Sequence, residues 1–295
     1  MSNEIEALCR QFKALGDPAR LRIVALCRTG EVSVGELVDI LGQSQPRVSQ
    51  HLKRLCEAGL LRRFRDGKRV YYRLAADGAA PVRRFIDRLP PDAATLVNDA
   101  EQLRQKRGAV LPAEGQTGNA ERAVARALIE LTVTAPLGDL LDIGCGRGAL
   151  LKLLASRARR AVGVDIDADA RSIARAELYL AGLDNCSLRQ GDMYSLPFAA
   201  ERFDTIILDD VLLSSDRPEA VLKEACRLLR PAGRLVVLSA IGEEPEASAG
   251  VLARVSRGVG LRMAPPRYLP ETKPEWLLTV MSANAQAAAG DAVAA

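Results

Sequence analysis

The chain has 295 residues, of which 48% are apolar and 26% charged, a composition that suits two soluble domains of ordinary size. No stretch approaches the roughly 20 consecutive apolar residues of a membrane-spanning helix, and the acidic start lacks the apolar core of a secretory signal, so we expect a cytoplasmic protein without a membrane partner. Residues 1–90 carry 17 Lys and Arg against 10 Asp and Glu. This basic balance favours a polyanionic partner for the first part of the chain.

Six cysteines and one histidine are the candidate ligands for a transition metal. The cysteines form no Cys-x-x-Cys pair, and a single imidazole is a poor basis for a zinc or metalloid site. We therefore expect free thiols and no bound metal. Redox sensing by thiols in the first part of the chain stays open as an alternative. Those thiols belong to Cys9, Cys27 and Cys56.

Two short helices are predicted near the start of the chain. Asp17 and Pro18 begin the first, because Asp caps free backbone N–H groups and Pro suits the first helical position, and Gly30 ends it. Ser33 and Glu36 have the spacing of a capping box at the start of the second helix. Both helices should therefore have well-defined first turns.

A third helix follows Ser44, with Val48, Leu52 and Leu55 at the spacing of one buried stripe. Two short helices joined by a tight turn, the second with Gln, Arg and Lys outside, are typical of a helix-turn-helix. Gln and Arg read adenine and guanine edges in the major groove, whereas Lys mostly contacts phosphate. The predicted DNA-contacting residues are Ser44, Gln45, Arg47, Gln50, His51, Lys53 and Arg54, with Arg47 and Gln50 as base readers.

Two β-rich runs, 60–65 and 68–74, flank Asp66-Gly67, a pair typical of a hairpin turn. Directly after a helix-turn-helix, a basic hairpin is expected to be a wing that contacts the phosphate backbone. A surface hairpin with a solvated basic face is the alternative. The wing residues predicted to contact DNA are Arg65, Lys68 and Arg69.

The first domain resembles the ArsR/SmtB family of bacterial repressors over residues 12–23, 44–61 and 70–74. The resemblance implies a homodimeric winged helix that binds an inverted repeat in double-stranded operator DNA and releases it when a ligand binds. Arsenic-sensing members carry a Cys-x-Cys-like pair in the helix before the recognition helix, where this chain has Ser33 and Gly35. We therefore expect a signal other than a metal.

Two helices are predicted in the middle of the chain, over 81–89 and 92–107. In the ArsR family a C-terminal helix helps to form the dimer, so this segment is expected to be a second dimerisation element, with a helical spacer as the alternative. The expected organisation is a winged helix-turn-helix domain over 1–78, a helical dimerisation segment and linker over 79–119, an S-adenosyl-nucleoside-binding domain over 120–283 and a disordered tail over 284–295.

A Rossmann-like fold is predicted for the second domain. An apolar strand, 140–143, runs into a glycine-rich turn that ends at Gly148, and a helix follows from Ala149. Glycine allows a positive φ and lets the backbone approach a ligand closely. The next strand ends in Asp165, 21 residues after Gly144, where an acid can accept hydrogen bonds from ribose hydroxyls. Nicotinamide and S-adenosyl ligands share these requirements.

Four ordered segments resemble class I methyltransferases: 141–148, 191–193, 203–209 and 227–237, the last as helix, turn and fifth strand. The resemblance implies a site for S-adenosylmethionine or S-adenosylhomocysteine, with Asp165 on the ribose diol. Core packing of Ile166 and Met193, and a purely structural role for Cys145, are the alternatives. The predicted ligand-binding residues are Asp142, Gly144, Cys145, Gly146, Gly148, Asp165, Ile166, Asp192, Met193 and Asp209.

Enzymes that methylate amino groups of DNA bases carry an Asn/Asp-Pro-Pro-aromatic motif after the fourth strand. Residues 209–215 of this chain read Asp-Asp-Val-Leu-Leu-Ser-Ser instead, so base methylation is not expected. Small-molecule methylation remains open, because methyl transfer can proceed by alignment of the reactants alone. No catalytic residue is predicted, and Asp210 is a candidate general base that nothing distinguishes from other acids.

A repressor head joined to an S-adenosyl-nucleoside pocket resembles bacterial regulators of the methionine cycle that respond to S-adenosylhomocysteine. We therefore expect a two-domain regulator: an N-terminal α+β winged helix-turn-helix and a C-terminal α/β Rossmann-like class I methyltransferase sandwich. An active small-molecule methyltransferase with an autoregulatory DNA-binding domain is the first alternative. A redox regulator with an inert second domain is the other.

Overall fold

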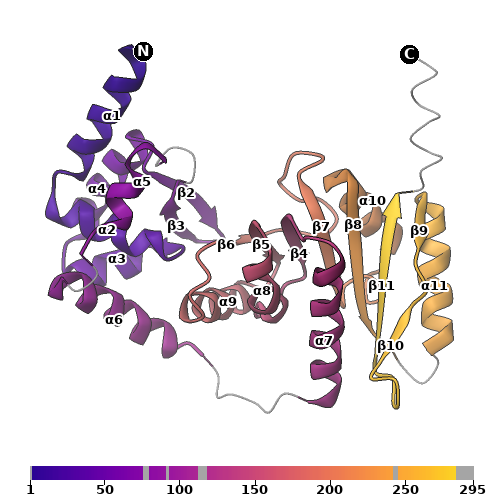
Figure 1. Ribbon diagram of the computed structural model, residues 1–295. Helices are drawn as coiled ribbons and strands as arrows, with labels where there is room; N and C mark the ends of the chain where they lie inside the picture. Colours follow the sequence, from indigo (N-terminus) through magenta and orange to yellow (C-terminus); the bar gives the residue numbers. More distant parts are fainter. Residues whose placement is uncertain (1, 76–79, 91–92, 112–117, 242–244, 284–295) are drawn as a thin grey trace. The chain divides into compact units, whose positions relative to one another are not determined.

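The computed structural model describes residues 2–75, 80–90, 93–111, 118–241 and 245–283 (Figure 1). The chain forms two compact units. The first comprises Met1–Leu111 and Arg175–Asp184, and the second comprises Pro112–Ala174 and Asn185–Ala295. The predicted disordered tail, 284–295, and the central part of the predicted linker lie outside the described residues.

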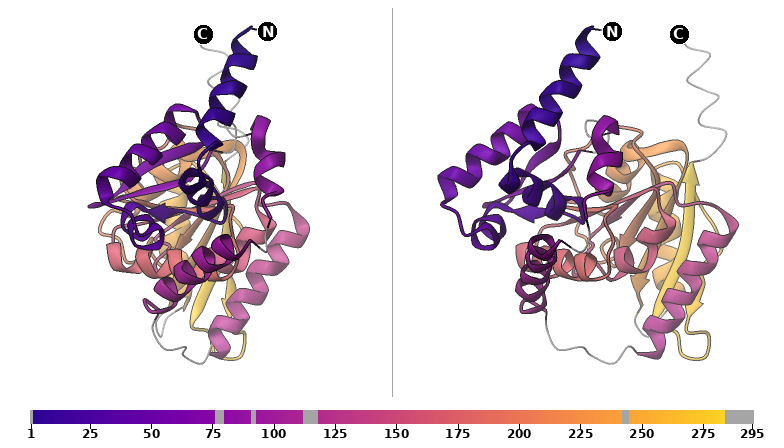
Figure 2. Two further views of the ribbon diagram at one scale, coloured as in Figure 1. Left: turned by 90° about the vertical axis from the view of Figure 1, so that its left-hand side faces the viewer. Right: turned by 60° about the vertical axis from the view of Figure 1, so that its left-hand side comes forward.

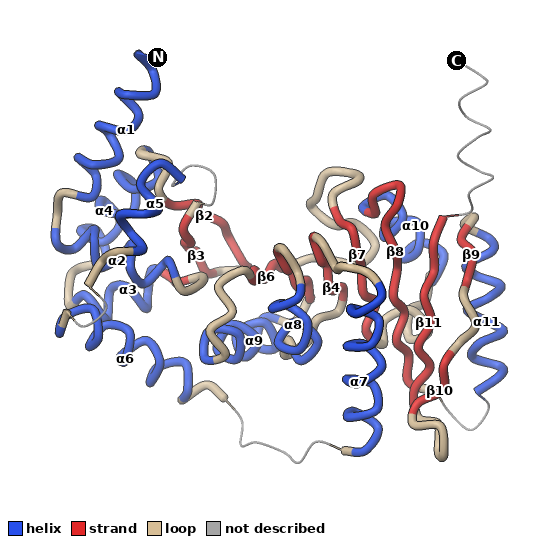
Figure 3. The backbone as a smooth tube through the Cα atoms, in the orientation of Figure 1, coloured by secondary structure: helices blue, strands red, loops and turns tan. Residues whose placement is uncertain are grey.

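The first unit consists of helices and a small antiparallel sheet (Figure 3). The sheet order is β1-β3-β2, and β2 and β3 form the predicted wing after helices α3 and α4, which form the predicted helix-turn-helix. The winged helix-turn-helix fold is thereby confirmed. Its elements are α1 (Ser2–Leu15), α2 (Pro18–Arg28), β1 (Val32–Ser33), α3 (Val34–Leu41), α4 (Gln45–Glu57), β2 (Leu61–Asp66), β3 (Arg69–Leu74), α5 (Ala80–Asp87) and α6 (Ala94–Gly108).

The helix starts in this unit follow from the capping residues. The Arg20 N–H donates to Asp17 Oδ1 at 3.0 Å. Ser33 and Glu36 form a reciprocal capping box: the Ser33 N–H donates to Glu36 Oε2 at 2.7 Å and the Glu36 N–H donates to Ser33 Oγ at 3.2 Å. Ser44 is the N-cap of α4, but its side chain makes no capping hydrogen bond. The start of α4 is therefore stabilised by the fixed φ angle of Pro46 and by side-chain packing rather than by a side-chain cap.

The wing turn lies one residue later in the chain than the Asp-Gly pair suggested. Asp66 pairs with Arg69 across the hairpin, so Gly67 and Lys68 are the two turn residues. Gly67 has a φ of +58°, which suits a tight hairpin turn of the kind that glycine favours. Asp66 is therefore a strand residue, and its side chain is buried, with 6% exposed.

The second unit is built on one large sheet with helices on both faces. Its elements are α7 (Asn119–Thr134), β4 (Asp139–Ile143), α8 (Ala149–Leu154), a 3₁₀ turn (Ala155–Arg157), β5 (Arg160–Asp165), α9 (Ala168–Leu180), β6 (Cys186–Gln190), β7 (Phe203–Asp209), α10 (Pro218–Leu228), β8 (Leu229–Ala240), α11 (Pro245–Gly258), β9 (Leu261–Met263), β10 (Arg267–Leu269) and β11 (Trp276–Ala283). Helix α9 continues into the first unit from Arg175 onward.

Among the described residues this sheet has eight strands, in the order β10-β11-β8-β7-β4-β5-β6 with β9 paired to β11. Strands β4 to β8 are parallel, and β11 runs antiparallel to β8. Helices α7 and α8 cover one face, and α10 and α11 cover the other (Figure 2). The predicted Rossmann-like methyltransferase fold is confirmed. The segment 227–237, predicted as helix, turn and fifth strand, holds the end of α10 and the first part of β8. The pairing with β7 steps from Phe203–Leu229 to Thr205–Arg234, so residues 230–233 have no partner in β7.

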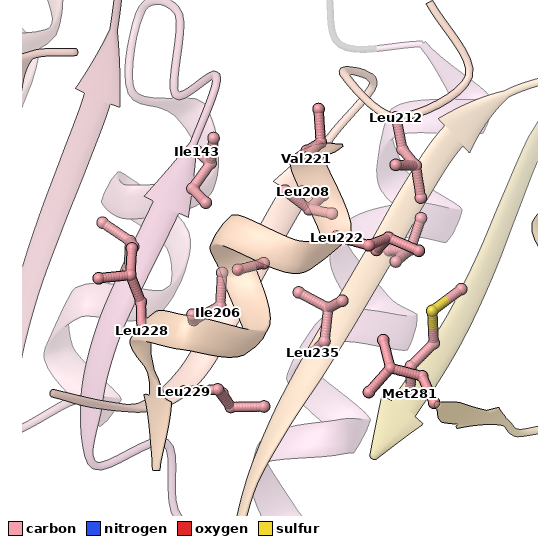
Figure 4. Close-up of a cluster of buried hydrophobic side chains, with 14 of the residues drawn as sticks. Ile143, Ile206, Leu208, Leu212, Val221, Leu222, Leu228, Leu229, Leu235 and Met281 are labelled. Atoms are coloured by element: carbon pink, nitrogen blue, oxygen red, sulfur yellow. The ribbon is translucent and has the colours of Figure 1, made fainter. Parts of the chain in front are cut away.

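Apolar side chains from the sheet and from α10 fill the core of the second unit. Figure 4 shows Ile206 and Leu208 of β7 and Leu235 of β8 facing Val221 and Leu222 of α10. All five are at most 1% exposed. The continuous apolar runs of β4, β5 and β7 are explained by this burial on both faces. None of the described helices is long and apolar enough to cross a membrane.

Candidate ligand site and DNA-binding surface

The glycine-rich loop between β4 and α8 follows a backbone path that glycine permits. The φ angle is +78° at Gly144, +49° at Gly146 and +81° at Gly148. A Cβ atom on Gly144 would lie 2.2 Å from Val211 Cγ1, so a side chain has no room there. A Cβ atom on Gly146 would meet no atom of the described residues within 4 Å. The backbone at Gly146 therefore faces open space, as close approach of a ligand requires.

Asp165, the last residue of β5, holds this loop in place. Its Oδ2 accepts the Gly146 N–H at 2.8 Å, and its Oδ1 accepts the Asp167 N–H at 2.8 Å. The N–H groups of Gly144 and Cys145 both donate to the Val164 carbonyl, at 2.8 and 3.0 Å. Each carboxylate oxygen can accept about two hydrogen bonds, so Asp165 keeps capacity for two further donors, such as a pair of hydroxyls.

Asp142, on β4 two residues before the loop, carries a buried carboxyl group. The residue is 1% exposed, and neither carboxyl oxygen has a hydrogen-bond partner among the described residues. Burial raises the pKa of Asp142 well above its ordinary value, and the nearby charges of Asp209 and Asp165 raise it further. A buried polar group without a partner is unfavourable by a few kcal/mol. A donor or a cation brought by a ligand would remove that penalty.

Three carboxyl groups gather at one edge of the sheet. Strands β7, β4 and β5 are neighbours, and Asp209, Asp142 and Asp165 lie at or near their carboxyl ends. Burial, with a contribution from the charge of Asp210, raises the pKa of Asp209 to about 6. In open α/β sheets the carboxyl ends of the strands are where ligands bind. This end of the sheet therefore favours a ligand that offers hydrogen-bond donors and positive charge.

The remaining predicted ligand residues differ in their surroundings. Ile166 is 69% exposed, which is unusual for a large apolar side chain and fits a surface on which a flat base could rest. Asp192 is exposed, and its Oδ1 accepts the Tyr194 N–H at 3.0 Å. Met193 is half-buried and packs against the core of the second unit, as the packing alternative anticipated. Cys145 is 4% exposed.

Sequence reasoning missed a contact between the loops that follow β6 and β7. The Tyr194 hydroxyl lies 2.9 Å from Ser215 Oγ, and the Arg217 guanidinium carbon lies 4.2 Å from the centroid of the Tyr194 ring. No motif in the sequence marks these three residues, because the contact depends on how two loops distant in sequence meet.

Asp210, the candidate general base, is engaged in holding the backbone. Its Oδ1 accepts the Ala240 N–H at 2.9 Å, and its carbonyl accepts the Ser214 hydroxyl at 2.7 Å. Its φ of +54° is rare for a residue other than glycine. The geometry thus gives Asp210 a structural task that the sequence did not indicate.

The predicted DNA-contacting residues of α4 and the wing lie on exposed positions, with one exception. Those exposed in the first unit are Ser44, Gln45, Arg47, Gln50, Lys53, Arg54, Arg65, Lys68 and Arg69. His51 is 8% exposed, and its Nδ1 lies 3.9 Å from Asp17 Oδ1. Burial is the main cause that lowers the pKa of His51. Because its ring is buried, His51 is unsuited to the direct DNA contact that we predicted for it.

The thiols differ in accessibility. Cys9 is exposed, Cys27 is buried and Cys56 is half-buried. Burial raises the pKa of Cys27 far above its ordinary value and also raises the pKa of Cys56. Because the thiolate is the reactive form, this argues against redox sensing by Cys27 and Cys56. Within the described ranges, no cluster of three or more His, Cys, Asp or Glu could hold a metal ion.

Two family models match separate parts of the chain. Residues 17–63 match the family described as bacterial regulatory protein, arsR family, and residues 141–237 match the methyltransferase domain. The DNA-binding and ligand sites described above fall within or beside these two segments.

Curated relatives match one part of the chain or the other. Over 77 residues the chain is 46% identical to the arsenical resistance operon repressor of Escherichia coli (strain K12), a match that covers 26% of this chain and 66% of that protein. Over 118 residues it is 41% identical to nocamycin O-methyltransferase of Saccharothrix syringae, covering 39% of this chain and 42% of that protein. The chain thus spans less than two thirds of the length of these relatives.

Solved structures resemble the methyltransferase part. One is the crystal structure of a SAM dependent methyltransferase from Aquifex aeolicus, which is 15% identical with a TM-score of 0.49 and whose match covers 60% of this chain and 97% of that chain.

Proposed function

Because the chain joins an ArsR-type DNA-binding domain to a methyltransferase domain, we propose that it is a homodimeric transcriptional repressor whose operator binding is controlled by S-adenosylhomocysteine or S-adenosylmethionine. Methionine-cycle genes are the proposed targets, since that cycle makes and consumes both ligands. The single observation that carries the ligand proposal is Asp142, a buried carboxyl without a partner beside a glycine loop with an open side.

The residues around the glycine loop suit an S-adenosyl ligand. The free accepting capacity of Asp165 suits a ribose diol, and the exposed side chain of Ile166 suits one face of adenine. The carboxyl oxygens of Asp142, which have no partner among the described residues, would accept hydrogen bonds from polar groups of the ligand. Bound S-adenosylmethionine would bring an activated methyl group, which a sensor leaves unused.

The two ligands differ in one physical respect to which the carboxyl groups at this site would respond. S-adenosylmethionine carries a positive sulfonium centre, whereas the sulfur of S-adenosylhomocysteine is neutral. An ionised carboxylate at this site would favour the cation electrostatically. A sensor of the neutral thioether must offset that preference by packing where the methyl group is missing. Both ligands are therefore needed in any binding experiment.

Exposed apolar side chains in the first unit support a dimer. Ile5 and Phe12 on α1 are 64% and 48% exposed, Phe85 on α5 is 46% exposed, and Val97 on α6 is 50% exposed. Large apolar side chains that gather on an exposed surface often mark an interface. A two-fold dimer would present two α4 helices to half-sites about one DNA turn apart.

The test is calorimetric titration of the full chain with each ligand, with and without an operator selected from random duplexes by the protein itself. We expect at least one ligand to bind with an affinity that changes about fivefold or more when the operator is present, because linkage requires the same factor in both directions. If neither ligand changes operator affinity, the proposal fails.

A second candidate function is small-molecule methyl transfer. It is favoured by the 41% identity to an O-methyltransferase over 118 residues and by the fact that alignment alone can support the reaction. Incubation with methyl-labelled S-adenosylmethionine and a panel of hydroxyl and carboxyl acceptors distinguishes it. Labelled product that accumulates over many turnovers supports an enzyme, whereas ligand binding coupled to DNA without turnover supports the sensor.

A further inference from the structure

Helix α9 belongs to both compact units. It begins at Ala168, three residues after Asp165, the last residue of β5, yet its residues from Arg175 onward group with the first unit. A single uninterrupted helix therefore runs from the candidate ligand site into the unit that carries α4 and the wing. The side chains at its two ends show what each end is attached to.

Within the first unit, Arg175 is held by two acids from the DNA-binding fold. Its Nη2 donates to Asp66 Oδ2 at 2.6 Å, and its Nε donates to Glu31 Oε2 at 3.0 Å. The guanidinium carbon lies 3.9 Å from the centroid of the Tyr71 ring. Arg175, Glu31 and Asp66 are 7%, 5% and 6% exposed. Asp66 belongs to wing strand β2 and Tyr71 to wing strand β3, so Arg175 contacts both strands of the wing.

A second contact lies one helical turn further along α9. The Arg107 guanidinium carbon sits 4.4 Å from the centroid of the Tyr179 ring. Arg107 Nε in turn donates to Glu36 Oε1 at 2.9 Å, and Glu36 is the capping-box residue of α3. The second half of α9 is thus connected to the wing and to the first helix of the helix-turn-helix.

At its other end, α9 is tied to the glycine loop through Asp165. Arg171 is 1% exposed, and its Nη1 donates to the Asp165 carbonyl at 2.9 Å. The Asp165 carboxylate accepts the N–H groups of Gly146 and Asp167, and Asp167 Oδ1 accepts the Asp169 N–H at 2.8 Å at the start of the helix. Arg171 and Arg175 are four residues apart, a rise of about 6 Å along a helix.

We propose that α9 transmits ligand occupancy at Asp165 to the wing through the buried cluster of Arg175, Glu31 and Asp66. The inference rests on the proposed function and names its route of regulation. A ligand whose hydroxyls donate hydrogen bonds to Asp165 repositions the first turn of α9. Charged hydrogen bonds in a buried setting resist stretching, so the wing follows the helix as one body. Occupancy then changes how Arg65, Lys68 and Arg69 meet the phosphate backbone.

The test removes the cluster without leaving a buried charge behind. The triple variant Glu31→Gln, Asp66→Asn and Arg175→Met replaces all three charged groups by neutral groups of similar size. Binding of S-adenosylhomocysteine and S-adenosylmethionine is measured by calorimetry, and operator affinity is measured by fluorescence anisotropy with and without each ligand. The matched control is Arg126→Met, which removes an 84% exposed arginine side chain of α7 that pairs with Glu130.

We expect the triple variant to bind the ligand within about threefold of wild type, while the ratio of operator affinities with and without ligand falls to within about twofold of one. The control should keep the wild-type ratio, which for typical allosteric couplings lies between about 5 and 150. If neither ligand changes the operator affinity of the wild-type protein, the proposed function itself fails. If ligand changes the operator affinity of the wild-type protein and of the triple variant by the same factor, only this inference is overturned.

Hydrogen exchange of the wild-type protein gives a second test that does not depend on the variant folding. Binding of either effector should change the exchange of wing peptides covering residues 61–74, whereas peptides from β11, residues 276–283, serve as the internal reference. Ligand binding that leaves wing exchange unchanged overturns the proposed route even where operator affinity responds.

Discussion

At the scale of single residues, Asp165 has two tasks that share one carboxylate. It accepts backbone N–H groups from the glycine loop and from the start of α9, and it retains lone pairs for a ligand. The sequence indicated the second task from the spacing to Gly144. The first task depends on how the loop folds back onto β5, which spacing alone does not specify.

Replacing Asp165 by Ala should abolish the response to ligand while operator binding remains. Loss of hydrogen bonds to a charged acceptor typically costs about 1.5–3 kcal/mol each, so ligand affinity should fall at least about tenfold. Calorimetry and anisotropy on the same preparation measure both properties. Asp169→Ala, which changes an exposed acid in the first turn of α9, is the control. Unchanged ligand affinity in Asp165→Ala would contradict the assigned site.

Burial and the charge of Asp210 raise the pKa of Asp209 to about 6. This shift predicts the direction in which ligand affinity changes with pH. A cationic ligand favours the ionised carboxylate, so affinity for S-adenosylmethionine should rise between pH 5 and 7 by up to about tenfold. The same shift makes the unliganded fold less stable as pH rises from about 4 to 6, because the folded state holds the proton more tightly than the unfolded chain does.

Asp209→Asn should flatten this pH dependence relative to wild type. Calorimetric titrations at pH 5, 6 and 7 measure it, with Asp216→Asn, an exposed acid after β7, as the control. Equal slopes in wild type and Asp209→Asn would show that another group controls the titration.

At the scale of elements, the sequence predicted helices well where a local cap specifies them. The capping box of Ser33 and Glu36 formed as its spacing indicated. The segment 227–237 was predicted as helix, turn and fifth strand, but the sequence did not predict that residues 230–233 lack partners in β7. Strand register depends on a strand distant in the chain, so local patterns do not specify it. The burial of His51 was missed because its position on α4 borders the buried stripe and its neighbour Asp17 comes from another helix.

The exposed face of α4 leads to a prediction about DNA recognition. Arg47→Ala should weaken binding to the selected operator by about 1–3 kcal/mol and relax preference at one base pair, whereas Lys53→Ala should weaken binding to all duplexes alike. Anisotropy with the operator and with scrambled duplexes separates the two effects. An equal loss on both duplexes for Arg47→Ala would reassign this residue to phosphate contact.

At the scale of the whole molecule, the exposed apolar side chains on α1 lead to a prediction about assembly. Ile5→Glu should convert a dimer into monomers, because it places a charge in an apolar contact. Light scattering after gel filtration measures the mass, and Arg10→Ala, an exposed position on the same helix, is the control. Operator affinity should fall together with dimer formation, since one half-site contact is lost. A monomeric wild type would exclude this interface.

The division into two units could be predicted from the sequence only in part. A winged helix-turn-helix, a helical middle segment and a Rossmann-like domain follow from local patterns. The assignment of Arg175–Asp184 to the first unit does not, because Arg175, Glu31 and Asp66 are far apart in the chain. Long-range ion pairs leave no periodic signal, so only the folded structure reveals them.

The shared helix α9 limits how the two halves of this protein can be exchanged. A fragment that ends at residue 111 removes the guanidinium that pairs with Glu31 and Asp66 and the ring beneath Arg107. Such a fragment is not the full DNA-binding module, even though it contains the whole helix-turn-helix. To transplant the DNA-binding unit of this protein intact, residues 175–184 must therefore be moved together with residues 1–111. The unit that recombination or protein engineering would transfer is thus discontinuous in the gene.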